Sequence, residues 1–283
     1  MDAVPPGDYH VHTFYSDGEG SVEDCVQRAL AVGLSEIGVA DHVSGVPSAP
    51  WELASIPLER MDDYVAEVLE AAARHDDITV LLGVEADYLP GHEDELAELL
   101  AAYPFQFVVG GVHVIDGFDF DNPERRDDPR WSDTDAVFTA NYDAVRAAVE
   151  STRVDVSGGG PARPGAEIAR FDVIAHLDYV GLWGHTPGPA VEPALNAALD
   201  ARAAHGCAIE LNTDRFSDPA GVMYPSEDIL RRACARGIPL VVSSDAHCPA
   251  HVGRLWDEAI ALARRAGFTE TLRMSDRTLV PLP

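Results

Sequence analysis

Short apolar segments rich in β-branched residues alternate with longer segments of helical periodicity along almost the whole chain. Parallel strands need a crossover between them, which is usually a helix, so this alternation is typical of a parallel sheet or barrel. We therefore expect an α/β fold built around a parallel barrel. The predicted strands span 8–12, 36–40, 78–84, 105–112, 171–175, 207–211 and 238–244, and the predicted helices span 21–33, 57–74, 93–102, 134–150, 190–205, 226–237 and 253–266.

Histidine and carboxylate side chains stand at or just beyond the carboxyl ends of six of the seven predicted strands. In a parallel barrel these ends form one rim, where barrel enzymes build their active sites. A single histidine at a strand end is usually structural, but the joint placement favours a hydrolytic site of two or three zinc, manganese or iron ions. The residues concerned are His10, His12, His42, Glu85, His113, His176, Asp245 and His247.

The first predicted strand carries two of these histidines. Side chains alternate across a strand, so His10 and His12 project from the same face. Two imidazoles on one face form part of a metal chelate that ligands from other strands can complete.

The formal net charge of −28 argues against a nucleic-acid-binding groove, because binding to phosphate backbones depends on lysine and arginine. Bound divalent cations would offset part of this charge. No apolar run of membrane-spanning length occurs, and residues 1–6 carry neither a basic region nor an apolar segment, so we expect a soluble, cytoplasmic protein without a membrane partner. Four widely spaced cysteines without a CxxC pair indicate reduced thiols.

The length of 283 residues is within the range of a single barrel, and we expect one domain over residues 1–283. Two segments interrupt the alternation. Residues 116–133 are polar and aromatic, and we expect a long loop over the site. Residues 151–170 are rich in glycine and proline, which is typical of a flexible loop that either shapes a substrate pocket or lies on the surface without a role.

Motifs in these strands and loops resemble those of the PHP family, the polymerase and histidinol phosphatase superfamily, and within it the histidinol-phosphatase branch. They follow the family's order over nearly the whole chain: DYHVHTFYSDGEGS, IGVADH, LGVEADY, VGGVHVIDGFDFDNPE, FDVIAHLD, IELNT, YPSEDIL and GIPLVVSSDAH followed by HVGR. The resemblance implies a distorted (β/α)7 TIM-like barrel, which agrees with the seven predicted strands.

The resemblance also implies nine metal ligands, and all nine positions carry the residue type that the family uses. The implied cofactor is a set of two or three divalent ions, of zinc, manganese or iron. The ligands would be His10, His12 and Asp245 for one ion, Glu85 as a bridge to a second ion held by His113 and His176, and Asp17, His42 and His247 for a third.

The reaction that the resemblance implies is hydrolysis of a small phosphomonoester, with L-histidinol phosphate as the first candidate and histidine biosynthesis as the pathway. Metal-activated hydroxide would attack phosphorus in line. The catalytic residues would be Glu85, which bridges the metals, together with Asp17 or His247, which would assist protonation of the departing alkoxide.

Arginines are the expected phosphate-binding residues. The family segment resembling NTSGLRKP corresponds here to residues 212–219, where Arg215 is displaced and two acids lie nearby. Arg254 and Arg163 are the other candidates for substrate binding, with Arg125 and Arg126 as further loop arginines. For each of them, pairing with a surface carboxylate is the alternative.

Two alternative functions stay open. The departures after IELNT and the glycine-rich segment favour a PHP-type phosphoesterase with another substrate, such as a nucleotide, a sugar phosphate or a specialised metabolite. A nuclease or proofreading module, or a non-catalytic binding domain, is disfavoured by the net charge and by the intact ligand set. The oligomeric state is not readable from the sequence.

Overall fold

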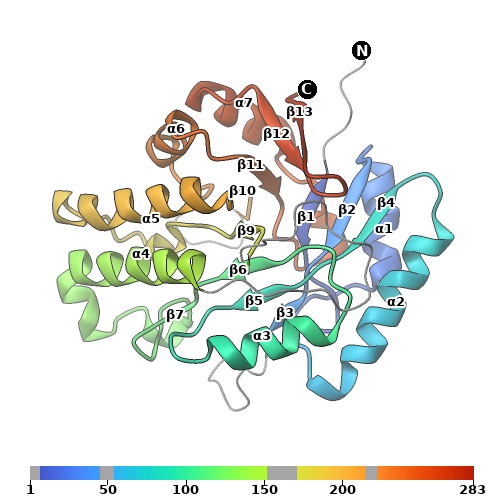
Figure 1. The fold of residues 1–283 in the computed structure, drawn as a ribbon, viewed down its shortest axis with the longest axis horizontal. Helices are drawn as coiled ribbons and strands as arrows, with labels where there is room; N and C mark the ends of the chain where they lie inside the picture. The colour runs from blue at the N-terminus through green and yellow to red at the C-terminus, as the bar shows by residue number, and fades with distance from the viewer. Residues whose placement is uncertain (1–6, 45–53, 152–170, 215–221) are drawn as a thin grey trace.

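Short parallel strands occupy the centre of the molecule, and helices surround them (Figure 1). The structure is a computed structural model that describes residues 7–44, 54–151, 171–214 and 222–283. One parallel sheet contains, in spatial order, β1 (Asp8–Val11), β2 (Glu36–Val39) and β4 (Thr79–Leu82). The second has the order β11 (Leu240–Ser243), β10 (Ala208–Asn212), β9 (Val173–Ile174), β6 (Val109–Gly111), β5 (Glu85–Asp87) and β3 (His42–Val43).

The strand pairings form a ring. β2 pairs with β4, and their continuations β3 and β5 pair with each other after short interruptions. At the other edge, Val11 forms a parallel bridge with Ala246, and the N–H of His12 donates to the Ala246 carbonyl at 2.9 Å. The pairings thus return to β1 after seven strand positions, so the predicted α/β class and strand count are confirmed.

The third predicted strand is broken between β4 and β5, at Gly83 and Val84. A Cβ atom on Gly83 would lie 2.1 Å from Cζ of Phe107, so only glycine lets the strand pass this ring. The second predicted strand is broken at Ala40 and Asp41, where the Asp41 carboxylate accepts hydrogen bonds from Thr13.

Seven α-helices are described, and they correspond to the seven predicted ones. The first shows the expected capping box, in which Ser21 and Asp24 each accept from the other's backbone N–H. The last begins three residues later than predicted, because Leu255 has a left-handed backbone (φ 52°) just before it. The helices are α1 (Val22–Ala31), α2 (Met61–Arg74), α3 (Glu93–Ala102), α4 (Thr134–Glu150), α5 (Glu192–His205), α6 (Glu227–Ala235) and α7 (Trp256–Ala266).

Residues 116–133, expected as a long loop, contain local structure. A hairpin of β7 (Val114–Ile115) and β8 (Phe118–Asp119) leads into two 3-10 turns, η3 (Pro123–Arg125) and η4 (Pro129–Asp133). The other 3-10 turns are η2 (Leu58–Arg60), η5 (Tyr179–Gly181), η6 (Pro189–Val191) and η7 (Pro249–His251). The second expected loop, 151–170, lies outside the described residues except for Ser151.

Two apolar clusters hold the fold together. The larger one lies between the strands and the surrounding helices. The smaller one contains Phe107, which is fully buried, together with one residue from each of several strands and Met274. Met274 follows β12 (Glu270–Arg273), which pairs antiparallel with β13 (Thr278–Pro281).

The β12–β13 hairpin was not predicted. Its second strand is largely exposed and pairs only with the first, so it lacks the apolar run of a buried strand. All four cysteines are free thiols, and Cys25 and Cys207 are buried. None of the helices in the described ranges is long and apolar enough to cross a membrane.

Candidate metal centre

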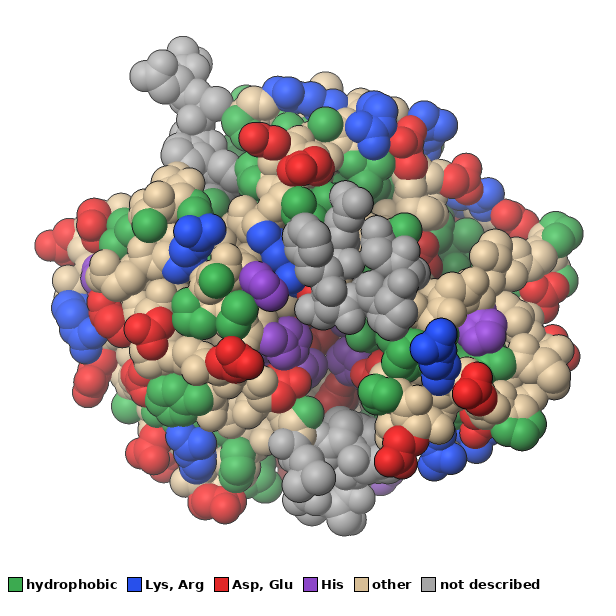
Figure 2. Space-filling view, turned by 180° about the vertical axis from the view of Figure 1, so that it is seen from behind, with side chains coloured by type: hydrophobic (Ala, Val, Ile, Leu, Met, Phe, Trp, Pro, Cys, Tyr) green, Lys and Arg blue, Asp and Glu red, His purple; other side chains and the backbone are tan. Residues whose placement is uncertain are grey.

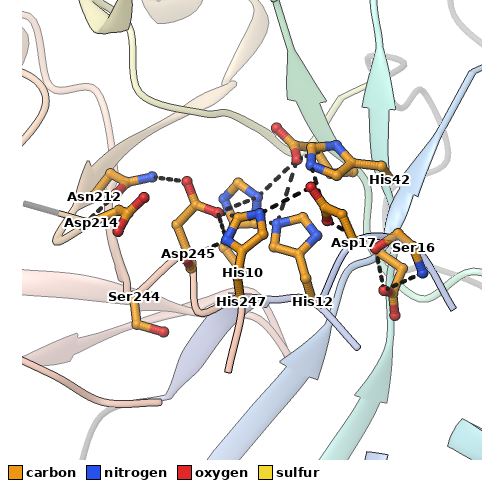
Figure 3. A network of polar contacts seen from close by, with 12 residues as sticks. His10, His12, Ser16, Asp17, His42, Asn212, Asp214, Ser244, Asp245 and His247 are labelled. Carbon is orange, nitrogen blue, oxygen red and sulfur yellow. Dashed lines mark hydrogen bonds and ion pairs between the residues drawn. The ribbon is translucent and has the colours of Figure 1, made fainter. Parts of the chain in front are cut away.

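All nine predicted ligand side chains meet at the carboxyl ends of the strands. His10 lies in β1, and His12 and Asp17 follow it; the other six come from β3, β5 and the residues after β6, β9 and β11. Figure 3 shows the labelled members turned toward one another. From outside, histidines and carboxylates gather in a central hollow on the face opposite to the view of Figure 1 (Figure 2).

Glu85 is the centre of this arrangement. Its Oε2 atom lies 3.0 Å from Nε2 of His10 and 2.9 Å from Nδ1 of His42. Its Oε1 atom lies 3.6 Å from Nε2 of His113 and 3.5 Å from Nε2 of His176. The two oxygens of one carboxylate therefore face two different groups of histidines, which is the geometry of a bridging ligand.

Asp245 lies beside the first group. Its Oδ1 atom is 3.1 Å from Nε2 of His12, 3.6 Å from Nε2 of His10 and 3.7 Å from Nδ1 of His247. Nε2 of His247 is also 3.4 Å from Oδ2 of Asp17. This side of the centre therefore alternates imidazoles with carboxylates.

Within the described residues, three sets of side chains have ligand atoms within 4.8 Å of one another, as the binding of one metal ion requires. The sets share members, so neighbouring ions would share ligands. They are His12, Asp17, His42 and His247; His10, His12 and Glu85; and His42, Glu85 and His113.

Two carboxylates on the far side of His10 and His113 determine which ring nitrogen carries the proton. Nδ1 of His10 is 2.8 Å from Oε1 of Glu210, and Nδ1 of His113 is 2.6 Å from Oδ1 of Asp87. A carboxylate accepts and does not donate, so both Nδ1 atoms carry the proton. In the neutral ring, Nε2 then directs its lone pair at Glu85, an arrangement typical of metal-binding histidines.

When these rings are neutral, lone pairs therefore face each other in a buried space. Nε2 of His10 and both carboxylate oxygens of Glu85 are buried and have no hydrogen-bond partner among the described residues. Buried acceptors without donors cost free energy unless a cation lies between them. Imidazole and carboxylate ligands suit zinc, manganese and iron, so the residues present fit a divalent metal centre.

The charges of the centre shift its pKa values strongly. Burial lowers the pKa of His42, but Glu85, Asp17 and Asp87 together outweigh it and raise this pKa to about 9. Burial is likewise outweighed at His113 by Asp87 and at His247 by Asp17, so that both pKa values rise to about 10. These rings therefore hold protons near neutral pH where no metal competes for them.

His12 and Glu85 behave differently. Burial, with the neighbouring His247 and His42, lowers the pKa of His12 to about 3. Burial raises the pKa of Glu85, but His42 and His10 outweigh it and hold this pKa well below its usual range. Glu85 is therefore an anion throughout the physiological pH range.

Two of the predicted ligands have strained backbones. His176 has φ 25° and Asp245 has φ 51°, although neither is glycine. Such conformations cost free energy and occur preferentially at functional sites.

Among the described residues, Asp17 and His247 are the most exposed members of the centre. The side chains of Asp17 and His247 are each 35% exposed, whereas those of His10 and Glu85 are at most 1% exposed. A small ligand would therefore reach the centre past Asp17 and His247.

Four supporting residues were not predicted. Asp41 accepts from the N–H and hydroxyl of Thr13, both at 2.7 Å, and holds the loop that carries Asp17. The other three lie on buried strands and contact predicted ligands. Asp87 contacts His113, Glu210 contacts His10, and Asn212 contacts Asp245. The available signal was a charged or amide residue inside an otherwise apolar strand, which has to find a polar partner when buried.

The arginines expected to bind phosphate divide into two groups. Arg254 is 8% exposed; its guanidinium pairs with Asp214 and donates to the Ser244 carbonyl at 3.1 Å. It therefore has a carboxylate partner, as the alternative interpretation expected. Arg163 and Arg215 lie outside the described residues.

Comparisons with known proteins agree with one another. A model of the PHP domain family matches residues 8–214. A probable histidinol-phosphatase from Deinococcus radiodurans is 35% identical over 269 residues, which covers 92% of this chain and 93% of that protein. A histidinol-phosphatase from Lactococcus lactis is 24% identical over 282 residues, covering 95% of this chain and 94% of that protein.

The fold also matches a solved structure. The histidinol phosphate phosphatase of Lactococcus lactis, in complex with zinc, L-histidinol and phosphate, has a TM-score of 0.74 at 24% identity. The match covers 97% of this chain and 98% of that one. The two proteins therefore share a fold over nearly their whole length.

Proposed function

Because the chain belongs to the PHP domain family, we propose that it is a metal-dependent phosphomonoesterase that hydrolyses L-histidinol phosphate to L-histidinol and phosphate. The observation that carries the proposal is the position of Glu85, whose two buried carboxylate oxygens face histidine nitrogens from different strands without hydrogen-bond donors between them among the described residues. Relatives named as histidinol-phosphatases span almost the full chain and support this substrate, with histidine biosynthesis as the pathway.

We assign the metal ions to the ligands expected from the sequence. His10, His12 and Asp245 would hold one ion, and Glu85 would bridge it to a second. His113 and His176 would complete the second site, and Asp17, His42 and His247 would hold a third. Divalent ions there would acidify water and neutralise charge on the phosphate; zinc is the ion bound in the Lactococcus lactis enzyme, and manganese and iron suit the same ligands.

The most exposed residues of the centre would meet the substrate. Asp17 and His247 are 3.4 Å apart through Oδ2 and Nε2, and both are partly exposed. We assign to them the contact with the leaving group, and the one of the two that is not bound to the third ion would assist protonation of the departing alkoxide. Glu85 would stay ionised and keep the two metal ions that it bridges in position.

Phosphate binding is assigned to arginines. Arg215 and Arg163 are retained as candidates from the sequence. Arg254 lies next to the ligand loop, but its pairing with Asp214 reduces the positive charge that it offers to phosphate. The departure from the family pattern at residues 212–219 favours a second candidate function, a phosphatase of the same family with a different small phosphorylated substrate.

The deciding experiment is phosphate release from L-histidinol phosphate by protein whose metal content has been measured. Nucleotide, sugar and amino-alcohol phosphates are compared in parallel, and Glu85→Gln is the inactive control. A clear preference for L-histidinol phosphate in kcat/KM supports the proposal. Preference for another member of the panel identifies a different substrate and supports the second candidate function. Absence of turnover by metal-loaded protein overturns the proposed activity.

A further inference from the structure

Glu210 and Asn212 lie on one face of β10 and are both 1% exposed, but neither belongs to the proposed ligand set. Residues two apart on a strand project from the same face, so both side chains point toward the metal centre. A buried carboxylate in the middle of a strand is costly unless its oxygens accept hydrogen bonds.

Glu210 accepts from three donors. Its Oε1 atom is 2.8 Å from Nδ1 of His10, and its Oε2 atom accepts from the backbone N–H of His176 at 2.9 Å. Nδ2 of Asn212 donates to the same Oε2 atom at 3.1 Å and to Oδ2 of Asp245 at 2.9 Å. One buried network thus reaches three of the proposed ligands (the link from Asn212 to Asp245 is drawn in Figure 3).

These three ligands come from three different strand positions. β10 lies between β9, which precedes His176, and β11, which precedes Asp245. β1, which carries His10, follows at the bridge beside β11. The ligands also belong to two different proposed ions, so the network from one strand connects both sites.

Two of the three ligands depend on an external partner for their conformation. His176 and Asp245 have left-handed backbones, which L-residues adopt only when surrounding contacts hold them there. Glu210 binds the N–H of His176, and Asn212 binds the side chain of Asp245.

We infer that Glu210 and Asn212 are positioning residues that set the metal affinity of this centre, an inference that rests on the proposed function. Glu210 keeps the proton of His10 on Nδ1, so that Nε2 is available to a metal. The Glu210–Asn212 pair also keeps His176 and Asp245 in their strained conformations before a metal binds. Both residues are 1% exposed, so we assign neither of them a contact with the substrate.

Glu210→Gln is the sharpest test, because it preserves size and removes only part of the acceptor capacity. If the amide NH2 faces His10, the ring has to move its proton to Nε2, the metal-binding atom. If the amide is turned the other way, the NH2 faces the N–H of His176. Loss of a partner of this kind usually weakens metal binding by about 10–100-fold.

The matched control is Glu36→Gln. Glu36 is also a buried glutamate on a central strand, 4% exposed, but it accepts from the Tyr9 hydroxyl at 2.7 Å and has no contact with a proposed ligand. A general loss of stability would therefore affect both variants, whereas a positioning role affects only Glu210→Gln.

The readout is the affinity of the metal-free protein for Zn²⁺, measured by competition with a chromophoric chelator, with thermal unfolding of each metal-free variant alongside. We expect Glu210→Gln to bind about 10–100-fold more weakly and Glu36→Gln to bind as the unchanged protein does. Asn212→Ala, which leaves Oδ2 of Asp245 without this donor, should weaken binding as well and serves if Glu210→Gln fails to fold.

The outcomes separate the two ideas. Unchanged Zn²⁺ affinity in folded Glu210→Gln and Asn212→Ala overturns the positioning role while leaving the phosphatase proposal intact. Absence of Zn²⁺ binding by the unchanged protein overturns the metal centre itself. Equal weakening in Glu36→Gln reduces the effect to general stability and also overturns the positioning role.

Discussion

The two ends of the ring of strands treat buried charge in opposite ways. At the amino end, Glu36 accepts from the Tyr9 hydroxyl at 2.7 Å, and Asp172 accepts from Arg277 at 2.9 Å and from the N–H of Val108 at 2.8 Å. At the carboxyl end, Glu85 faces histidine ring nitrogens, and neither of its oxygens has a hydrogen-bond partner among the described residues.

The difference separates stability from function. A buried anion has to be neutralised. Either the chain supplies hydrogen-bond donors, or a bound cation supplies the opposite charge. The amino end uses side chains of the C-terminal hairpin, such as Arg277, and closes the fold. The carboxyl end leaves its anions to be neutralised by protons or metals, and so remains a site at which ligands can exchange.

Changing Glu85 should have the largest effect and should act on function. Glu85→Gln keeps the size of the side chain but loses the bridging anion, so we expect kcat/KM to fall by more than about 100-fold, beyond the usual cost of losing a supporting partner of a metal ligand. Steady-state kinetics with metal quantification by mass spectrometry measures this. Full activity in this variant would contradict the assignment.

Changing the packed interior should act on stability instead. Phe107→Ala removes a fully buried ring against which Gly38 and Gly83 pack, and should lower the free energy of unfolding by about 3–5 kcal/mol. Denaturant titration measures the loss. Leu69→Ala is the control, since Leu69 is 42% exposed and its truncation should cost less than about 0.5 kcal/mol.

Removing the contact between Arg277 of the C-terminal hairpin and Asp172 should give a smaller loss of stability, without an effect on the metal centre. Arg277→Met removes donors from the Asp172 carboxylate and from the Gln106 and Met274 carbonyls. We expect a loss of about 1–3 kcal/mol in the free energy of unfolding with an unchanged Zn²⁺ affinity. A large drop in Zn²⁺ affinity would mean that the two ends are coupled and would break the comparison.

The last comparison concerns the pH dependence of the carboxyl end. The pKa values of His42, His113 and His247 are raised, so their protonated forms stabilise the metal-free fold below the unfolded value of about 6.5. This contribution is lost as the pH rises through about 9 to 10. The free energy of unfolding of the metal-free protein should thus fall as the pH rises from about 6.5 to about 10.

Metals and protons compete for the same ring nitrogens, so Zn²⁺ binding near neutral pH should release protons. Calorimetry in buffers of different ionisation enthalpy counts them. Glu85→Gln removes the anion that raises the pKa of His42, so its metal-free form should show a flatter pH dependence of stability. An identical pH profile in the two proteins would contradict this origin of the effect.

Much of the site was predictable because a parallel strand ends at a defined place. Once the strands were recognised, the residues after them had to share one rim, and eight of the nine proposed ligand positions followed from this alone. Asp17 lies in a loop and came only from the family resemblance. The capping box of α1 was predictable for the same local reason, since Ser21 and Asp24 interact within one turn.

Other features depend on contacts between distant segments. Glu210 is separated from His10 by 200 positions in the chain, and Arg277 from Asp172 by 105, so no local pattern joins either pair. The exposed β12–β13 hairpin has no apolar period to mark it, and the breaks in the second and third strands depend on Thr13 and Phe107.

The sequence by itself determined the alternation of strands and helices and, through it, which ligand-type residues meet at one rim, because strand direction and side-chain alternation are local properties. Only the tertiary structure decided which buried acids find donors and which face other acceptors. That outcome depends on distances of a few ångströms between strands far apart in sequence. Glu36 therefore accepts a hydrogen bond and stabilises the fold, whereas Glu85, a glutamate on a neighbouring strand, has no hydrogen-bond partner among the described residues and is available to bind a cation.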